Sequence, residues 1–198
     1  MKTTILSVAA ALLLSACHKN NGALADEMPQ HTAKPHYIHY TIKKGQHYAE
    51  GNSYKPVETS EMRFTVRFDS TAVYKTTDPA NQNDINKLYG FSDNDAAHHS
   101  FSARFGWCWS RNALRLFAYV YNSGTMASRE LCTVAIGEEV GCSIKTAGSE
   151  YIFTVNGNIH RMPRASTTAR AKGYQLYPYF GGDEAAPHTI RIDIREEG

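Results

Sequence analysis

The sequence lacks a long apolar run and lacks an excess of charge of either sign, and both absences restrict its function. Its longest apolar stretch runs from Ile5 to Leu14 and is interrupted by Ser7. A membrane-spanning helix needs about 20 such residues, so we expect none in the mature chain. Lysine plus arginine number 21 against 19 for aspartate plus glutamate, and this balance leads us to expect no nucleic-acid partner.

Several catalytic signatures are absent as well. The chain has no Gly-x-Ser-x-Gly motif, no Walker-type phosphate loop, no Rossmann glycine pattern and no His-Glu-x-x-His motif. Nucleophilic, phosphate and nicotinamide chemistries are therefore unsupported. Its 198 residues make one globular domain the expected organisation once a signal is removed.

The first residues have the pattern of an exported protein. Lys2, the apolar stretch and Leu14-Ser15-Ala16 predict a signal peptide over residues 1–16. The sequence Leu-Ser-Ala-Cys resembles the lipobox of bacterial lipoproteins, and this resemblance implies acylation of Cys17, palmitate included, as a membrane anchor. His18, in place of Asp, favours the outer membrane or cell surface. The alternative is a plain signal peptide followed by a chance cysteine.

Residues 17–36 are polar and show no periodicity, which predicts a flexible tether carrying the lipidated cysteine. Residues 37–198 are expected to form the globular domain. Met62–Phe68 and Ile190–Arg195 alternate between apolar and charged side chains, as half-buried strands do. Other expected strands are Tyr37–Ile42, Thr71–Thr76, Phe101–Trp109, Leu114–Tyr121, Leu131–Ile136, Val140–Lys145, Tyr151–Val155 and Tyr174–Phe180. Only Asp84–Tyr89 favours a short helix, so the pattern predicts an all-β, two-sheet antiparallel β-sandwich or jelly roll.

Three of these strands share an unusual outer face. The alternation predicts that Phe101, Ala103, Phe105 and Trp107 face the core, with Ser102, Arg104, Gly106 and Cys108 outside. In Leu114–Tyr121 the aliphatic set faces inward, and in Tyr174–Phe180 the inward set is Tyr174, Leu176 and Phe180. The outward residues expected to bind a ligand are Arg104, Tyr119, Tyr121, Gln175, Tyr177 and Tyr179.

A surface of tyrosine, arginine and glutamine suits a poly- or oligosaccharide. Tyrosine rings lie against the C–H faces of sugars, glutamine amides bond to sugar hydroxyls, and arginine pairs with uronate or sulfate. Two other interpretations stay open. The rings could merely stabilise the sheet as cross-strand pairs, or loops could cover them.

The cysteines after the anchor are Cys108, Cys132 and Cys142, an odd number in an oxidising compartment. A turn centred on Gly137 would place Cys132 opposite Cys142, where they could form a disulfide. Two buried free thiols are an equally good interpretation. Cys108 has no partner in either case.

Polar loops could carry a cofactor. Two of these loops could hold Ca²⁺ or a transition metal. One contains Asp93-Asn94-Asp95 with His98-His99, and the other contains Asp183-Glu184 with His188. No recognised ligand spacing supports this, so solvated turns are the preferred interpretation and no cofactor is expected. Arg161, Arg164, Arg170 and Lys172 form a basic segment. We expect an exposed loop there, and the alternative is that the segment forms the rim of a groove for an anionic glycan.

Several motifs together resemble uncharacterised lipoproteins of Bacteroidota-type bacteria. They are Ser102–Trp107, Leu114–Tyr119, Tyr151–Gly157 and Tyr177–Gly182 with Ala186-Pro187-His188. The resemblance covers residues 38–194 and implies a concanavalin A-like lectin/glucanase jelly roll whose concave sheet binds glycans. The Glu-x-Asp-x-(x)-Glu strand of the glycoside hydrolases is missing, as are the Gln-[Ile/Val]-His and Arg-x-Glu-Leu-Arg motifs of the alginate-type lyases. The leading hypothesis is therefore a non-catalytic, membrane-anchored glycan-binding lipoprotein. The alternatives are a polysaccharide lyase and a structural or assembly lipoprotein that binds a protein partner.

Overall fold

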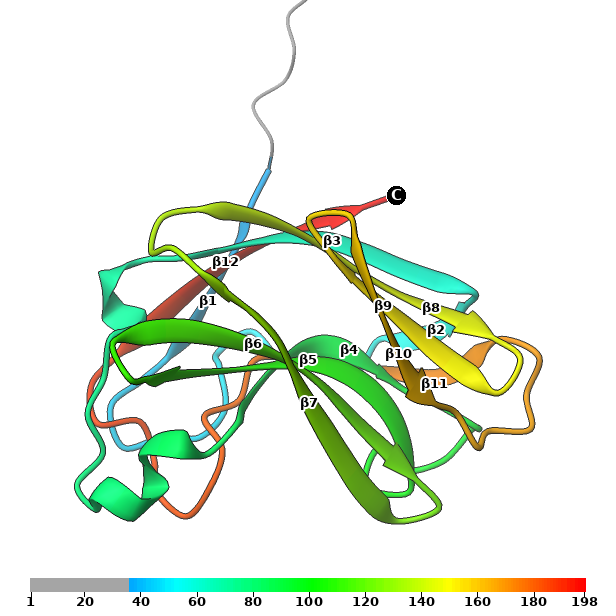
Figure 1. Cartoon of the computed structure of the whole chain (residues 1–198), viewed down its shortest axis with the longest axis horizontal. Coiled ribbons are helices and arrows are strands. Elements are labelled where there is room, and N and C mark those ends of the chain that lie inside the picture. The colour runs from blue at the N-terminus through cyan, green and yellow to red at the C-terminus, as the bar shows by residue number, and fades with distance from the viewer. Residues whose placement is uncertain (1–35) are drawn as a thin grey trace, which may run out of the picture. The chain divides into compact units, whose positions relative to one another are not determined.

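The computed structural model describes residues 36–198. The predicted signal peptide, Cys17 and the predicted tether up to residue 35 lie outside the described residues. Two antiparallel sheets of six strands pack face to face (Figure 1), which confirms the predicted all-β sandwich. Among the described residues no helix has the length and apolar character needed to cross a bilayer.

The first sheet has the strand order β1-β12-β3-β8-β9-β10. Its strands are β1 (Ile38–Ile42), β3 (Glu61–Phe68), β8 (Glu139–Ala147), β9 (Glu150–Val155), β10 (Asn158–Pro163) and β12 (Ile190–Glu197). The second sheet has the order β2-β11-β4-β5-β6-β7. Its strands are β2 (Pro56–Thr59), β4 (Asn86–Ser92), β5 (Phe101–Ser110), β6 (Ala113–Asn122), β7 (Thr125–Val134) and β11 (Ala171–Leu176).

The core forms where the inward residues of the two sheets meet. The inward residues of β3, β5, β6 and β12 are almost all fully buried, as the period of two predicts. Aromatic rings join the sheets: the Phe105 ring of β5 lies 5.6 Å from Phe64 of β3 and 5.1 Å from Phe153 of β9, both edge-to-face. The outer face of the second sheet is thereby fixed in place by a packed interior.

Two predicted elements are wrong. Asp84–Tyr89, predicted as a helix, leads into β4, where Leu88 and Tyr89 are fully buried between the sheets, so burial overrides the local preference. Thr71–Thr76, predicted as a strand, contains instead the end of a 3-10 helix, η1 (Ser70–Ala72), whose N-cap Asp69 accepts the backbone N–H of Thr71. A second 3-10 helix, η2 (Pro79–Asn83), starts after Asp78 in the same way.

The hairpin expected around Gly137 does not form. The chain passes there from β7 in the second sheet to β8 in the first, and the Gly137 N–H donates to the carbonyl of Phe68, 2.7 Å away. Cys132 pairs with Leu116 on β6 and Cys142 with Phe64 on β3, so the two cysteines are not cross-strand partners. Within residues 36–198, Cys108, Cys132 and Cys142 are all free thiols, and burial raises the pKa of each.

Candidate functional site

The floor of the candidate site is set by a bulge between β4 and β5. Lys87 pairs with Gly106 and Gly90 pairs with Arg104, so β4 has one residue more than β5 between the two pairs. Each cation therefore lies opposite a glycine on the outer face of the second sheet. A Cβ on Gly90 would lie 2.6 Å from the Cβ of Arg104 and 2.2 Å from the carbonyl oxygen of Ala103. The close approach of the two strands thus requires glycine at this position.

One tyrosine ring brings the two cations together. Tyr119 on β6 is the cross-strand partner of Arg104, and the Arg104 Cζ lies 5.3 Å from the centroid of its ring. The Lys87 Nζ lies 4.9 Å from the same centroid and donates to the carbonyl of Ile85 at 2.7 Å. The negative face of the ring attracts both cations, which partly offsets their mutual repulsion.

Aromatic and imidazole side chains surround these cations. Tyr179 exchanges two backbone hydrogen bonds with Lys87 and stacks on His47 with ring centroids 5.4 Å apart. In the loop between β4 and β5, the His98 Nδ1 lies 2.9 Å from the Tyr174 hydroxyl. His99 contacts the ring of Tyr121 edge-on at 5.4 Å. The side chains around the floor of the site thus come from β4, β5, β6 and β11 and from the loops at both ends of the second sheet.

Two adjoining hollows form a groove over this floor. The inner hollow has a volume of about 240 Å³ and is lined by Lys87, His98, His99, Arg104, Tyr119, Tyr121 and Tyr179. The outer hollow, of about 390 Å³, shares His98, Arg104 and Tyr179 with it and extends to Tyr54, Tyr174, Leu176 and Pro178. We call the two together the groove. Tyr54 and Tyr179 have 78% and 37% of their surface exposed, so their rings are accessible to a ligand.

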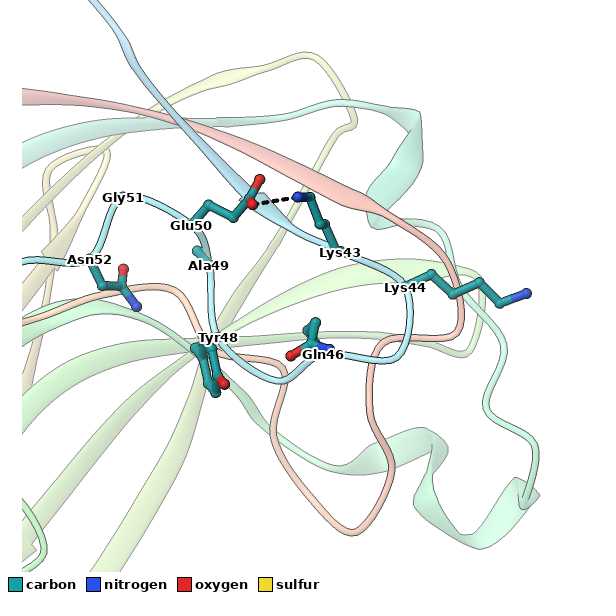
Figure 2. Close-up of a pocket in the computed structure, with 8 residues that line it drawn as sticks. All are labelled: Lys43, Lys44, Gln46, Tyr48, Ala49, Glu50, Gly51 and Asn52. Atoms are coloured by element: carbon teal, nitrogen blue, oxygen red, sulfur yellow. Dashed lines mark ion pairs between the residues drawn. The ribbon is translucent and has the colours of Figure 1, made fainter.

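A further hollow, of about 700 Å³, lies along the loop after β1 (Figure 2). Its side chains come from residues 43–52, and Lys43 pairs with Glu50 at 2.5 Å with both side chains largely exposed. Tyr48 in this loop forms a β-bridge with Tyr179, and Asn52 lines both this hollow and the outer part of the groove. The loop therefore forms one shoulder of the groove.

The described residues that line the groove make it cationic and supply no acidic side chain. Arg104 is only 6% exposed, and within the described chain its buried Nε has no hydrogen-bond partner. Burial lowers the pKa of Arg104 to about 10, and burial together with the charge of Arg104 lowers the pKa of Lys87 to about 8. No Asp or Glu is among the described residues that line either hollow. The groove can therefore accept an anion, and its described lining contains no pair of carboxylates of the kind that glycoside hydrolysis uses.

The neutral groups of the groove also have shifted pKa values. Burial, and then the charges of Arg104 and His99, lower the pKa of His98 to about 4, so this imidazole is neutral at physiological pH. Burial, and then the neighbouring Tyr121, raise the pKa of Tyr119 to about 12, so its hydroxyl keeps its proton. Shifted pKa values in a hollow are typical of functional sites.

Four of the six predicted site residues line the inner hollow: Arg104, Tyr119, Tyr121 and Tyr179. Gln175 and Tyr177 line only the outer hollow, and their side chains make contacts toward the sandwich interior because β11 has the opposite phase to the one predicted. The Gln175 Nε2 donates to the Tyr89 hydroxyl in the sandwich interior, and the Tyr177 ring packs on Tyr40 and Tyr89. Tyr174 and Leu176, predicted to face inward, line the outer hollow instead.

Loops and turns also cover part of the predicted outer face. Ser102 and Cys108, expected to be outside, are 0% and 1% exposed, and η2 packs against β5. The sequence interpretation missed Lys87 because it placed this residue in a helix. It noticed His98 and His99, but as loop residues for a metal. Their juxtaposition with Arg104 depends on the bulge and on the path of the loop.

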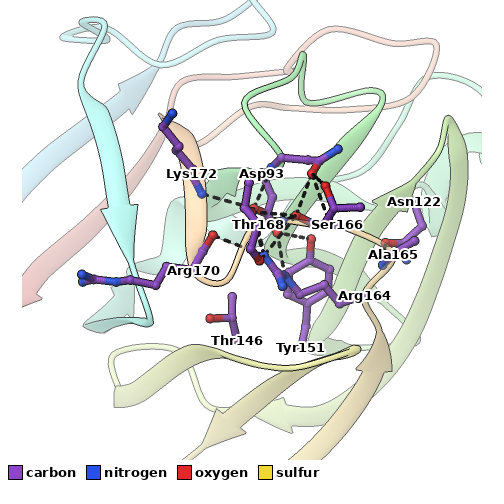
Figure 3. Close-up of polar contacts among 12 residues, drawn as sticks. Asp93, Asn122, Thr146, Tyr151, Arg164, Ala165, Ser166, Thr168, Arg170 and Lys172 are labelled. Atoms are coloured by element: carbon purple, nitrogen blue, oxygen red, sulfur yellow. Dashed lines mark hydrogen bonds and ion pairs between the residues drawn. The ribbon is translucent and has the colours of Figure 1, made fainter.

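The acidic loops predicted as one option for Ca²⁺ have structural roles, and Figure 3 shows the contacts of the first of them, around Asp93. Asp93 is fully buried and accepts hydrogen bonds from Arg164 and from the Tyr151 hydroxyl. Glu184 accepts the backbone N–H groups of Thr77 and Asp78. Among residues 36–198 no three His, Cys, Asp or Glu side chains converge as a metal site.

The fold is a jelly-roll sandwich, and the groove lies on the outer face of its second sheet. No protein-family model and no curated protein matches the chain, so the resemblance to Bacteroidota-type lipoproteins stays a prediction. Among solved structures, alginate lyase AlyC3 is similar over 81% of this chain and 74% of its own, with a TM-score of 0.55 and 9% identity. The laminarinase catalytic domain of Thermotoga petrophila RKU-1 is similar over 81% and 75%, with a TM-score of 0.53 and 12% identity. These likenesses confirm the concanavalin A-like jelly-roll fold.

Proposed function

We propose that the domain binds a glycan chain along the groove. The observation that carries this proposal is a set of tyrosine rings beside Arg104 in the outer hollow: the exposed Tyr54 and Tyr179 and the half-buried Tyr174. Flat rings suit the C–H faces of sugars, and the hydroxyl and guanidinium groups suit their oxygen atoms. Solved structures with the same fold include an alginate lyase and a laminarinase, which supports a carbohydrate as the ligand.

A glycan array probed with the purified domain, followed by titration calorimetry, tests this proposal. Replacement of the two most accessible groove rings, Tyr54→Ala with Tyr179→Ala, should weaken binding about fivefold or more, because each aromatic contact contributes about 0.5–1.5 kcal/mol. Tyr37→Ala is the matched control, because its ring lies between Arg67 and Arg195 of the first sheet. Unchanged glycan retention in the groove variant would reject the proposal.

A polysaccharide lyase is the second candidate, and one observation favours it. His98 is neutral, contacts the Tyr174 hydroxyl at 2.9 Å and lines the same hollow as Arg104. A neutral base can take the C5 proton of a uronate whose carboxylate is held by arginine; the C4–C5 double bond then forms, the C4–O bond breaks and the leaving oxygen takes up a proton. Incubation with uronate polymers decides between the candidates, since only the lyase forms an unsaturated product that absorbs ultraviolet light.

We further propose that the domain is exported and held on the outer membrane or cell surface by lipid on Cys17. The support is the signal-like segment before Leu14-Ser15-Ala16-Cys17, and two or more acyl chains suffice for stable anchoring. Cells fed an alkyne analogue of palmitate should label the wild-type chain but not Cys17→Ser. Equal labelling of both chains, or of neither, would contradict the anchor.

A further inference from the structure

Lys87 and Arg104 differ from the other well-buried cation of the described chain in having no anionic partner. The guanidinium of Arg164 is paired with Asp93 at 2.8 Å, and both side chains are almost wholly buried. Arg115, on the same outer face as Arg104, pairs with Glu130 at 2.6 Å. Lys87 and Arg104 have no such contact within residues 36–198, although burial is strong enough to lower the pKa of each. A buried charge without a partner destabilises a fold.

The sequence nevertheless builds this arrangement with several special residues. The bulge in β4 turns Lys87 outward, Gly106 lies opposite Lys87, and Gly90 lies opposite Arg104. A Cβ at Gly106 would lie 2.4 Å from Cγ2 of Ile85, so this glycine is needed as well as Gly90. Buried charge that lacks a partner and lines a hollow is typical of a site shaped for a ligand.

The inner hollow offers hydrogen-bond donors and no competing anion. The inner hollow is lined by the Nζ of Lys87, the guanidinium of Arg104 and the protonated hydroxyl of Tyr119. The described lining contains no carboxylate. Its volume of about 240 Å³ suits one sugar ring rather than a chain segment. Oxyanions are the ligands that such convergent, partly desolvated cations bind best.

From this geometry we infer that the inner hollow is a subsite for one acidic sugar, whose carboxylate or sulfate group is bound jointly by Lys87 and Arg104. The inference rests on the proposed glycan-binding function and specifies it. The outer hollow, with Tyr54 and Tyr174, then binds the neighbouring sugars of the same chain through their faces.

Matched pairs of oligosaccharides test the inference by calorimetry. One pair is an oligouronate and its carboxyl-reduced, neutral form; the other is a sulfated galactan oligosaccharide and its desulfated form. We expect an acidic member to bind about tenfold more tightly or better than its neutral form, the loss expected when a charge-assisted hydrogen bond is removed. Whichever pair shows the preference identifies the anion. Equal binding of acidic and neutral forms overturns the subsite while the glycan-binding function stands, whereas no binding of any oligosaccharide overturns both.

Variants identify the residues responsible and exclude a merely structural role. Lys87→Met and Arg104→Met keep the apolar stem, and each should abolish the preference for the acidic form while leaving the melting temperature unchanged or higher, because an uncompensated buried charge is removed. Arg115→Met removes a paired cation from the same face and should leave the preference intact. A melting temperature that falls in both groove variants, with the preference retained, would assign the two cations a structural role and overturn the inference.

Discussion

The Nε of Arg164 donates to the Oδ2 of Asp93 over 2.8 Å, and the two side chains are 2% and 0% exposed. The same carboxylate accepts the Tyr151 hydroxyl at 2.8 Å and the backbone N–H of Lys172 at 3.2 Å. This pair joins the loop after β4 to the segment between β10 and β11 (Figure 3), so it fixes one end of the second sheet. The loop that carries His98 begins at Asp93 and depends on the same pair.

Arg164→Met should lower the free energy of unfolding by about 3–5 kcal/mol, because it leaves the Asp93 carboxylate buried and unpaired. Urea denaturation measures the change. Arg161→Met is the matched control: its partner Glu150 and Arg161 itself are about half exposed, and such surface pairs contribute about 0–1 kcal/mol. Equal losses in the two variants would contradict the role assigned to burial.

The fold was predictable from the sequence where strands alternate regularly. In Leu114–Tyr121 every second residue faces the core as expected, and Met62–Phe68 and Ile190–Arg195 lie in strands of the first sheet. Each of these strands is hydrogen-bonded to another strand on both sides. The burial of its side chains alone therefore decides which residues face the core.

The rest depended on contacts that no local pattern contains. Gln175 and Tyr177 were assigned to the wrong face because the hydroxyl of Tyr89 and the ring of Tyr40, distant in sequence, provide their interior partners. Lys87 became part of the site through a bulge, which a sequence pattern does not reveal. Arg164 was expected in an exposed loop, and only the buried Asp93 explains why it is inside.

The stability of the domain should decrease as the pH falls from about 6.5 to about 4, owing to His98. Its pKa is 6.5 when unperturbed and about 4 in the folded protein, so between these values the unfolded chain binds the extra proton and stability is lost as the pH falls. The contribution is at most on the order of 3 kcal/mol. His98→Gln should flatten this part of the curve of urea midpoint against pH, whereas His188→Gln serves as a control. An unchanged curve in His98→Gln would refute the assignment.

Binding of an acidic oligosaccharide should weaken as the pH rises from 7 to 9. Lys87 has a pKa of about 8, so it loses its charge in this interval, while Arg104, with a pKa of about 10, keeps its charge. The other titratable groups at this position are His98, His99, Tyr119, Tyr121 and Tyr179 around the hollow, and Asp84, whose charge acts on Lys87.

Calorimetry of the same oligosaccharide at pH 7, 8 and 9 measures this dependence. Lys87→Met should bind more weakly at pH 7 and show a flatter profile. The neutral form of the oligosaccharide provides the control, because its binding should not follow the charge of Lys87. A profile in Lys87→Met as steep as that of the wild type would assign the titration to another group.

Gly90→Ala should destabilise the domain by about 1–3 kcal/mol, the usual effect of forcing extra volume into a packed site. Its Cβ would lie 2.2 Å from the Ala103 carbonyl oxygen and 2.6 Å from the Arg104 Cβ, so β4 and β5 must move apart and Arg104 must shift. Gly141→Ala is the matched control in β8, where the nearest atom to the new Cβ is the Oδ1 of Asn156 at 3.8 Å. Because the same contact positions Arg104, Gly90→Ala should also weaken glycan binding at temperatures where the variant is still folded. Wild-type stability and affinity in Gly90→Ala would show that the close contact between the strands neither limits the fold nor places the guanidinium.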